Sequence, residues 1–144
     1  MKTQLMVKSL AHACMWILFA TFMGLSQAED QSALANKIES VDFSTLPGGR
    51  VSIRVKTTEP LVNAPAGFTL SDPARIALDF PKVGNGLAKN NISAGQGELK
   101  SITLAQAKDR TRMVLNLTKN VGYTTSLSGN ELTVMLQADR KSVV

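Results

Sequence analysis

Three segments of the chain begin with arginine and continue with apolar residues at alternate positions. They are 50–55 (Arg-Val-Ser-Ile-Arg-Val), 75–80 (Arg-Ile-Ala-Leu-Asp-Phe) and 112–117 (Arg-Met-Val-Leu-Asn-Leu). Successive side chains of a β-strand point to opposite faces, so each arginine lies opposite the apolar side chains of its strand. The polar faces of the second and third segments, the latter extended back by two residues, then hold Arg75, Asp79, Arg110, Arg112 and Asn116.

These five residues are our candidate ligand-binding residues. Arginine presents a planar fork of donors that matches a carboxylate, while Asp and Asn accept hydrogen bonds from hydroxyl groups. The set therefore suits a ligand rich in carboxylates, amides and hydroxyls. The same residues could instead form a solvated sheet face, on which Arg–Asp pairs stabilise neighbouring strands without binding anything. Alternation and charge alone favour this second interpretation.

The N-terminal residues 1–28 have the pattern of a secretory signal peptide. Lys2 and Lys8 come early, residues 11–25 are mostly apolar, and Ser26-Gln27-Ala28 offers small residues at the positions that a signal peptidase reads. A permanent membrane anchor is the less favoured alternative, because the apolar run is shorter than the roughly 20 residues that span a bilayer. Cleavage after Ala28 would remove the single Cys, His and Trp of the chain, which are Cys14, His12 and Trp16.

The predicted mature chain, residues 29–144, keeps 14 basic and 11 acidic residues and so a charge of +3. Without Cys or His it has no thiol nucleophile, no imidazole base and no His/Cys zinc site. A pair of carboxylates could still hydrolyse glycosides, but none stands out, and we expect Asp79 and Asp109 to pair with neighbouring arginines. We therefore expect a binding module without cofactor, metal or catalysis. The dispersed charge makes no basic stripe for nucleic acid.

Short alternating segments broken by Gly, Pro, Asn and Asp recur from residue 36 to residue 137, as is typical of β-strands. We predict strands at about 37–44, 50–57, 67–71, 75–80, 99–105, 112–117, 123–127 and 131–137. Residues 84–97 are polar and rich in Gly and Asn, which predicts a long surface loop. A slip in alternation between Ile38 and Val41 indicates a β-bulge, and Ser128-Gly129-Asn130 indicates a tight hairpin.

Seven or eight short strands at this spacing favour an all-β fold, either an antiparallel sandwich or a small barrel. The apolar residues at alternate positions suffice for one core. We expect the phenylalanines of these strands, Phe43, Phe68 and Phe80, to lie in that core. Few aromatic rings then remain exposed for stacking on sugars, which favours recognition of peptides and carboxylates.

Two blocks of sequence carry a family resemblance. Residues 72–81 (Asp-Pro-Ala-Arg-Ile-Ala-Leu-Asp-Phe-Pro) and 109–117 (Asp-Arg-Thr-Arg-Met-Val-Leu-Asn-Leu), in this order, resemble AMIN domains, and 38–51 and 60–70 extend the likeness. More narrowly, the chain is similar to the N-terminal domain of PilQ-like type IV pilus secretins. The resemblance implies a periplasmic β-sandwich that associates with peptidoglycan and localises an envelope machine. It also implies that Arg75, Asp79, Arg110, Arg112 and Asn116 lie in the blocks that mark the family.

Together, the residue patterns and this resemblance predict a signal peptide (1–28), a flexible segment (29–35), an AMIN domain (36–137) and a frayed tail or linker (138–144). The expected function is non-catalytic binding of peptidoglycan that targets the pilus outer-membrane complex. The alternative is a docking module for another pilus-assembly protein, through the arginine-bearing face or a strand edge near residues 68–71. Because ring, barrel and amidase domains do not follow, we expect a targeting module alone, a fragment or a truncated product. The mature chain is expected to lack a transmembrane segment.

Overall fold

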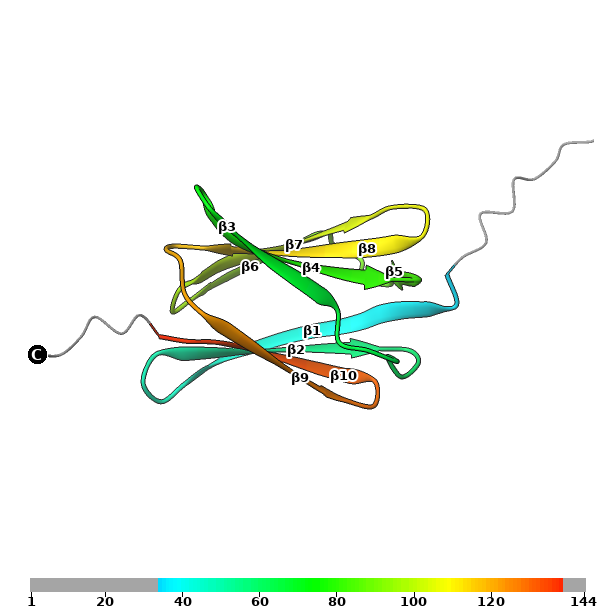
Figure 1. Cartoon of the computed structure of the whole chain (residues 1–144), viewed down its shortest axis with the longest axis horizontal. Coiled ribbons are helices and arrows are strands. Elements are labelled where there is room, and N and C mark those ends of the chain that lie inside the picture. Colours follow the sequence, from blue (N-terminus) through cyan, green and yellow to red (C-terminus); the bar gives the residue numbers. More distant parts are fainter. Residues whose placement is uncertain (1–33, 139–144) are drawn as a thin grey trace, which may run out of the picture. The chain divides into compact units, whose positions relative to one another are not determined.

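Alternation of apolar and polar residues builds a sandwich of two β-sheets, seen in the computed structural model of the chain (Figure 1). The structure describes residues 34–138. The predicted signal peptide, residues 29–33 and tail residues 139–144 lie outside the described residues. The predicted all-β sandwich is confirmed.

Residues 34–138 contain ten strands in two five-stranded sheets. Sheet A has the order β5-β1-β2-β10-β9 and sheet B the order β3-β4-β8-β7-β6. Every pair of neighbours is antiparallel except β1 and β5, which are parallel. The bounds are β1 (Asn36–Leu46), β2 (Arg50–Thr57), β3 (Ala66–Ser71), β4 (Ala74–Pro81), β5 (Val83–Asn85), β6 (Asn91–Gln96), β7 (Leu99–Gln106), β8 (Arg110–Leu117), β9 (Tyr123–Ser128) and β10 (Glu131–Leu136).

The core lies between the sheets and is built from alternate residues of the central strands. On β2 the buried residues are Val51, Ile53 and Val55, and β4, β7, β8 and β10 contribute in the same way. Two threonines are also buried. The Thr57 hydroxyl donates to the carbonyl of Glu59 at 2.8 Å, and the Thr111 hydroxyl donates to that of Val83 at 2.8 Å. Both are therefore satisfied, as buried polar groups must be.

The prediction of a loop over residues 84–97 is wrong, because this stretch contains the end of β5 and all of β6. These two strands account for ten rather than seven or eight strands among the described residues. Their sequence signal is weak. β5 has three residues, and the only apolar side chains that β6 packs against the core are Ile92 and Ala94, with the polar Ser93 between them.

Two local predictions are confirmed. The register of β1 against β2 shifts between Ile38 and Ser40, as expected for the bulge. β9 and β10 form a tight hairpin in which Ser128 pairs with Glu131 and Gly129 has φ of 60°. Glycine adopts this left-handed conformation without the steric cost that a Cβ brings.

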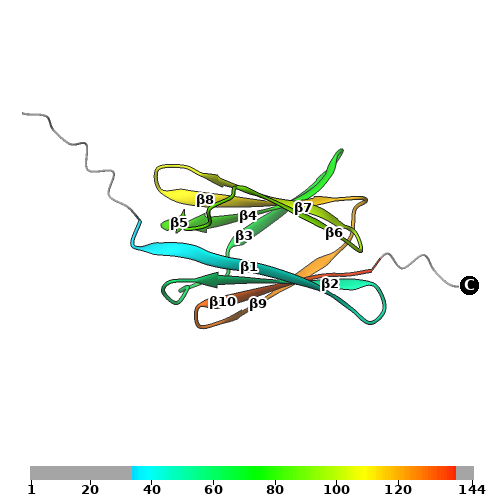
Figure 2. The same ribbon diagram turned by 180° about the vertical axis from the view of Figure 1, so that it is seen from behind.

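The strands β1 and β10 flank β2 on either side, and both run antiparallel to it. They are therefore parallel to each other. As a result, the chain enters sheet A at one end of the sandwich, at the start of β1, and leaves it at the opposite end, after β10 (Figures 1 and 2).

Candidate binding face

All five candidate residues lie on the outer face of sheet B. β4 and β8 are adjacent, with Arg75 opposite Asn116, Asp79 opposite Arg112 and Pro81 opposite Arg110. The residues between them, such as Ile76 and Leu115, are buried in the core. Alternation within each strand and the pairing of β4 with β8 together bring Arg75, Asp79, Arg110, Arg112 and Asn116 onto one surface, and we call this set the arginine face.

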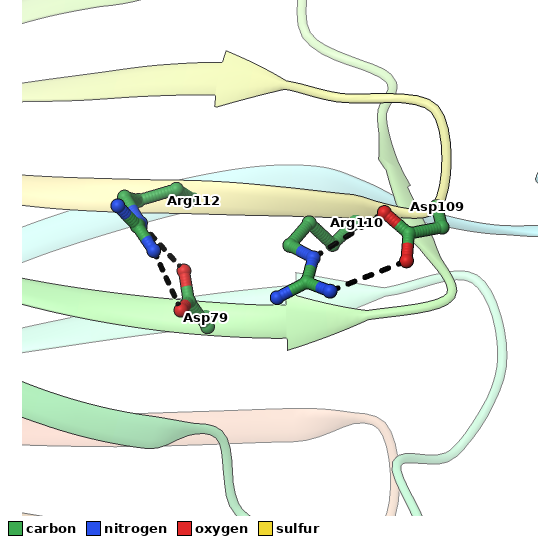
Figure 3. A network of polar contacts seen from close by, with 4 residues as sticks. All are labelled: Asp79, Asp109, Arg110 and Arg112. Carbon is green, nitrogen blue, oxygen red and sulfur yellow. Dashed lines mark hydrogen bonds and ion pairs between the residues drawn. The ribbon is translucent and has the colours of Figure 1, made fainter.

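Asp79 and Arg112 form a two-point ion pair across the strands (Figure 3). Arg112 Nε donates to Asp79 Oδ1 at 2.7 Å, and its Nη2 donates to Oδ2 at 2.9 Å. The Arg112 side chain is 47% exposed and that of Asp79 is 21% exposed. This is the planar fork-to-carboxylate geometry that makes arginine pairs well defined.

This contact favours the charged form of both groups. The hydrogen bonds from Arg112 lower the pKa of Asp79, against an opposing effect of burial, and the charges of Arg112 and Arg110 lower it further. The pKa of Arg112 is raised, chiefly by its hydrogen bonds to Asp79. Both side chains are therefore charged at neutral pH, and Asp79 is an acceptor already engaged.

Arg110 pairs with its chain neighbour Asp109, at the start of β8 (Figure 3). Nε and Nη2 of Arg110 each lie 3.3 Å from a carboxylate oxygen of Asp109. The hydrogen bonds and the charge of Arg110 lower the pKa of Asp109. The prediction that Asp79 and Asp109 pair with neighbouring arginines is thus confirmed.

An aromatic ring supports Arg112 from the side of β3. The guanidinium carbon of Arg112 lies 5.3 Å from the centroid of the Phe68 ring, within the range of cation–π contacts. Phe68 is 41% exposed and Leu70 is 43% exposed, so the prediction that Phe68 lies in the core is wrong. Phe80 is buried, and Phe43 is partly buried and packs against the core.

The register of β3 explains why Phe68 points outward. Phe68 pairs with Ala77 of the outer face, whereas the preceding Gly67 pairs with Leu78 of the core face. A Cβ on Gly67 would overlap the hydroxyl of Tyr123 and come within 2.9 Å of Leu78 Cδ2. Glycine is required at this inward position, and the two large apolar residues of the strand fall on the outside.

Arg75 and Asn116 differ from the other members of the arginine face. Arg75 is half-buried, and its guanidinium makes no hydrogen bond or ion pair with any residue in the range 34–138. Asn116 Nδ2 donates to Ser101 Oγ at 3.0 Å and Thr103 Oγ1 at 3.2 Å, both on β7. The arginine face thus contains one cation outside any ion pair of residues 34–138 and one oriented amide, and the two hydroxyls of β7 lie beside that amide.

Ser101 and Thr103 were not among the predicted site residues, and neither was Phe68. Ser101 and Thr103 come next to the arginine face only because β7 is the other neighbour of β8. Strand order is a long-range property that alternation within one strand does not contain. Gly67 was the available signal for Phe68, since a glycine in a strand often marks a close approach.

A hollow of about 660 Å³ adjoins the arginine face where β3 begins. One wall is the crossover from β2 to β3, residues 59–65, and the other is the end of β4 with Lys82 and Val83. Asp79 and Arg110 line the same hollow and connect it to the arginine face. The charged residues of its lining are Glu59, Asp79, Lys82 and Arg110, set among prolines and aliphatic residues.

Residues 34–138 contain no group of three or more His, Cys, Asp or Glu side chains placed to hold a metal ion. Within the same range, no helix has the length and apolar character that crossing a bilayer demands.

Comparison with known proteins supports the family resemblance. The AMIN domain family model matches residues 40–136. Fimbrial assembly protein PilQ of Pseudomonas aeruginosa is 46% identical over 103 residues, which cover 72% of this chain and 14% of that protein. The type IV pilus biogenesis and competence proteins PilQ of Neisseria gonorrhoeae and Neisseria meningitidis are each 34% identical over 119 residues, covering 83% of this chain.

The matched region spans only 14–16% of the length of these relatives. It nevertheless includes both sequence blocks that suggested the family, and the described strands of both sheets lie almost entirely within it. The chain belongs to the AMIN domain family, as represented in the PilQ proteins of type IV pili.

Proposed function

We propose that the chain is a non-catalytic peptidoglycan-binding module that acts in the periplasm and helps to localise the outer-membrane complex of the type IV pilus. Membership of the AMIN family and similarity to PilQ proteins support the proposed location in the periplasm and the association with the type IV pilus. The observation that carries the binding role is the guanidinium of Arg75, which has no partner within residues 34–138 and lies opposite Asn116 on the outer face of sheet B.

Peptidoglycan presents the groups that this face can bind. Its carboxylates and amide carbonyls accept hydrogen bonds, and Arg75 has donors that no residue in the range 34–138 uses. Its sugar hydroxyls both donate and accept, as do the hydroxyls of Ser101 and Thr103 next to Asn116. Because these side chains project from neighbouring strands, the backbone that carries them needs no reordering on binding, which favours affinity.

The paired residues of the arginine face hold its shape. Asp79 fixes Arg112, and Arg112 in turn lies against Phe68, so three strands present one continuous surface. Phe68 and Leu70 add an exposed apolar border to this surface. The ligand then meets a preformed platform with one free cation.

The protonation of the acidic residues supports a role without catalysis. Glycoside hydrolysis by two carboxyl groups needs one that stays protonated as a general acid. The pKa values of Asp79 and Asp109 are both lowered by the arginines that pair with them. Neither carboxyl is suited to deliver a proton near neutral pH.

Pelleting with purified peptidoglycan sacculi tests this function. The protein should sediment with sacculi at low salt and be released as salt rises, because exposed charges are screened. Arg75→Ala should reduce the pelleted fraction. Arg54→Ala is the matched control, since Arg54 lies on the outer face of sheet A and also has no ion pair within residues 34–138. Equal sedimentation of both variants with the wild type would refute the assignment to the arginine face. Wild-type protein that stays in the supernatant would refute wall binding itself.

The edge strand β3 favours a second candidate function, docking of another pilus-assembly protein. β3 pairs with β4 on one side only, all six of its residues are exposed, and it carries no charge. Such an edge can accept a strand from a partner. Thr69→Pro would remove a backbone donor from β3. Loss of partner capture with unchanged sedimentation on sacculi would favour docking over wall binding as the role of this edge.

A further inference from the structure

We propose that the hollow between the 59–65 crossover and the end of β4 binds the stem peptide of peptidoglycan. Lys82 would bind a carboxylate of that peptide, and Glu59 would bind the ammonium group of its diamino residue. The inference rests on the proposed function and extends it from the arginine face to a separate subsite for the peptide part of the polymer.

The size and lining of the hollow suit a short peptide. Its volume of about 660 Å³ lies within the roughly 300–1,000 Å³ typical of small-ligand sites. The crossover contributes Pro60, Leu61 and Pro65 to the wall, and Phe80 and Val83 of the core reach it from the other side. An extended backbone with small side chains could lie against these apolar surfaces.

Charge complementarity identifies the kind of peptide. Glu59 and Lys82 both line the hollow, and neither side chain forms an ion pair within residues 34–138. Asp79 and Arg110, which also line it, are already engaged with Arg112 and Asp109. The available charges are therefore one of each sign. A stem peptide that contains a diamino acid carries free carboxylates and a free ammonium, and so complements both.

The backbone holds Lys82 in an unusual conformation at this place. Lys82 has φ of 58°, in the left-handed region that residues other than glycine rarely adopt. Its N–H donates to the carbonyl of Asp109 at 2.7 Å, which ties the end of β4 to the turn before β8. Non-glycine residues in this region cluster at ligand sites. Position 82 therefore carries a cationic side chain where glycine would be the easier choice.

The hollow and the arginine face are continuous, because Asp79 and Arg110 belong to both. A glycan strand on the outer face of sheet B could therefore extend its peptide over the end of β4 into the hollow. This arrangement assigns the amide carbonyls and hydroxyls of the sugar part to Arg75 and Asn116, and the charged groups of the peptide part to Glu59 and Lys82.

An NMR titration of the isotope-labelled protein tests this assignment with two probes. A synthetic stem peptide containing a diamino acid should shift the amides of Leu61, Ala64 and Val83. Glycan strands stripped of their peptides should leave these amides unchanged and shift those around Arg75. Peptide-induced shifts that are absent from the hollow would overturn the inference, whereas the proposed function would still stand if sacculi sediment the protein. An unrelated peptide of ordinary L-residues that shifts the hollow equally would overturn it in favour of protein docking.

Variants sharpen the same test. Glu59→Gln and Lys82→Gln should each weaken stem-peptide binding by up to about fivefold, as expected for one exposed ion pair. Lys89→Gln, an exposed lysine that does not line the hollow, is the matched control. Ala64→Trp should abolish binding by filling the hollow, while Ala88→Trp, at an exposed position elsewhere, should not. Unchanged binding by Ala64→Trp with an unchanged melting temperature would contradict the location.

Discussion

The outer faces of the two sheets start from the same sequence pattern but carry their charges differently. On sheet A, Asp42 of β1 stands opposite Arg54 of β2, just as Asp79 stands opposite Arg112 on sheet B. Asp79 and Arg112 meet at 2.7 Å, whereas Asp42 and Arg54 form no ion pair. Opposite charges at facing positions are therefore not enough to form a pair.

A nearby aromatic ring on sheet B accounts for the difference. Arg112 has the ring of Phe68 beside it, which limits the positions open to the long arginine side chain. Arg54 has Thr133 on its other side, and its surroundings on β10 offer no ring. Ordering a free arginine costs up to about 2 kcal/mol of side-chain entropy, which an exposed ion pair rarely offsets. On the outer face of sheet A, Asp42 and Arg54 are therefore solvated separately. On the outer face of sheet B, Asp79, Arg112 and Phe68 hold one another in place.

The inner faces of the two sheets should contribute similarly to stability. Truncating a core residue on either sheet should cause the largest loss of stability that we predict. Ile53→Ala on β2 and Leu115→Ala on β8 each remove a fully buried side chain from the shared core. Each should lower the free energy of unfolding by about 2–5 kcal/mol. Urea denaturation measures both. A loss below about 1 kcal/mol for either variant would mean that the corresponding sheet contributes less to the core than its burial indicates.

Gly67→Ala should cause the next largest loss of stability. It would disturb the edge strand β3, which carries Phe68 on the outer face of sheet B. The new Cβ would overlap Tyr123 Oη and crowd Leu78, so we expect a loss of about 1–3 kcal/mol from overpacking. Gly122→Ala is the control, because its nearest contact would be an ordinary 3.7 Å to Gln137 Cγ. Thermal unfolding of the two variants should separate them clearly. Equal melting temperatures would show that β3 can move away from Tyr123 at little cost.

Asp79→Asn should cause a smaller and pH-dependent loss of stability. The folded state lowers the pKa of Asp79, so its contribution is fully present above the unfolded value of about 3.9 and is lost as pH falls through the lower folded value. The variant should melt below the wild type at pH 7, and the two should converge towards pH 2. Asp42→Asn should match the wild type at pH 7, since Asp42 has no ion pair among the described residues. If the melting temperatures of Asp79→Asn and the wild type differed by the same amount at every pH, the carboxylate charge would not be the cause of the difference.

Phe68→Ala should have the smallest effect, and it tests the explanation of the comparison directly. Without the ring, Arg112 should become as mobile as Arg54, and its hydrogen bonds to Asp79 should weaken. The pKa of Asp79 should then rise towards its ordinary value, as NMR titration of the carboxyl carbon would show. Leu70→Ala removes a similarly exposed residue of β3 that is not in the Arg112 contact, and it should leave this pKa where it is. An unchanged pKa in Phe68→Ala would mean that Asp79 alone orders Arg112.

Strands with strict alternation could be predicted closely from the sequence. β2 runs from Arg50 to Thr57 as expected, because Val51, Ile53 and Val55 alternate with polar residues and a Pro-Gly-Gly turn precedes them. β6 could not, since Ile92 and Ala94 give little apolar contrast. β5 is short and owes its existence to its parallel pairing with β1, a contact between residues about 47 apart in the chain.

The sequence predicts which side of its strand each candidate residue occupies, but it does not predict which residues of other strands it contacts. Alternation correctly placed Arg75 with Asp79, and Arg112 with Asn116, on one side of each strand. That these strands are neighbours depends on the strand order of sheet B, which no single segment encodes. The outward position of Phe68 depends on Tyr123 of the other sheet, so it too follows from tertiary packing.

The parallel placement of β1 and β10 on either side of β2 has a mechanical consequence. A tension applied through the two ends of the domain would pull β1 and β10 in opposite directions along their own axes. The hydrogen bonds between antiparallel strands lie perpendicular to those axes, so the bonds of each ladder would share the load and break together. Tension through the two ends would therefore load the strands in shear. This geometry resists extension better than an unzipping geometry, in which the hydrogen bonds open one at a time.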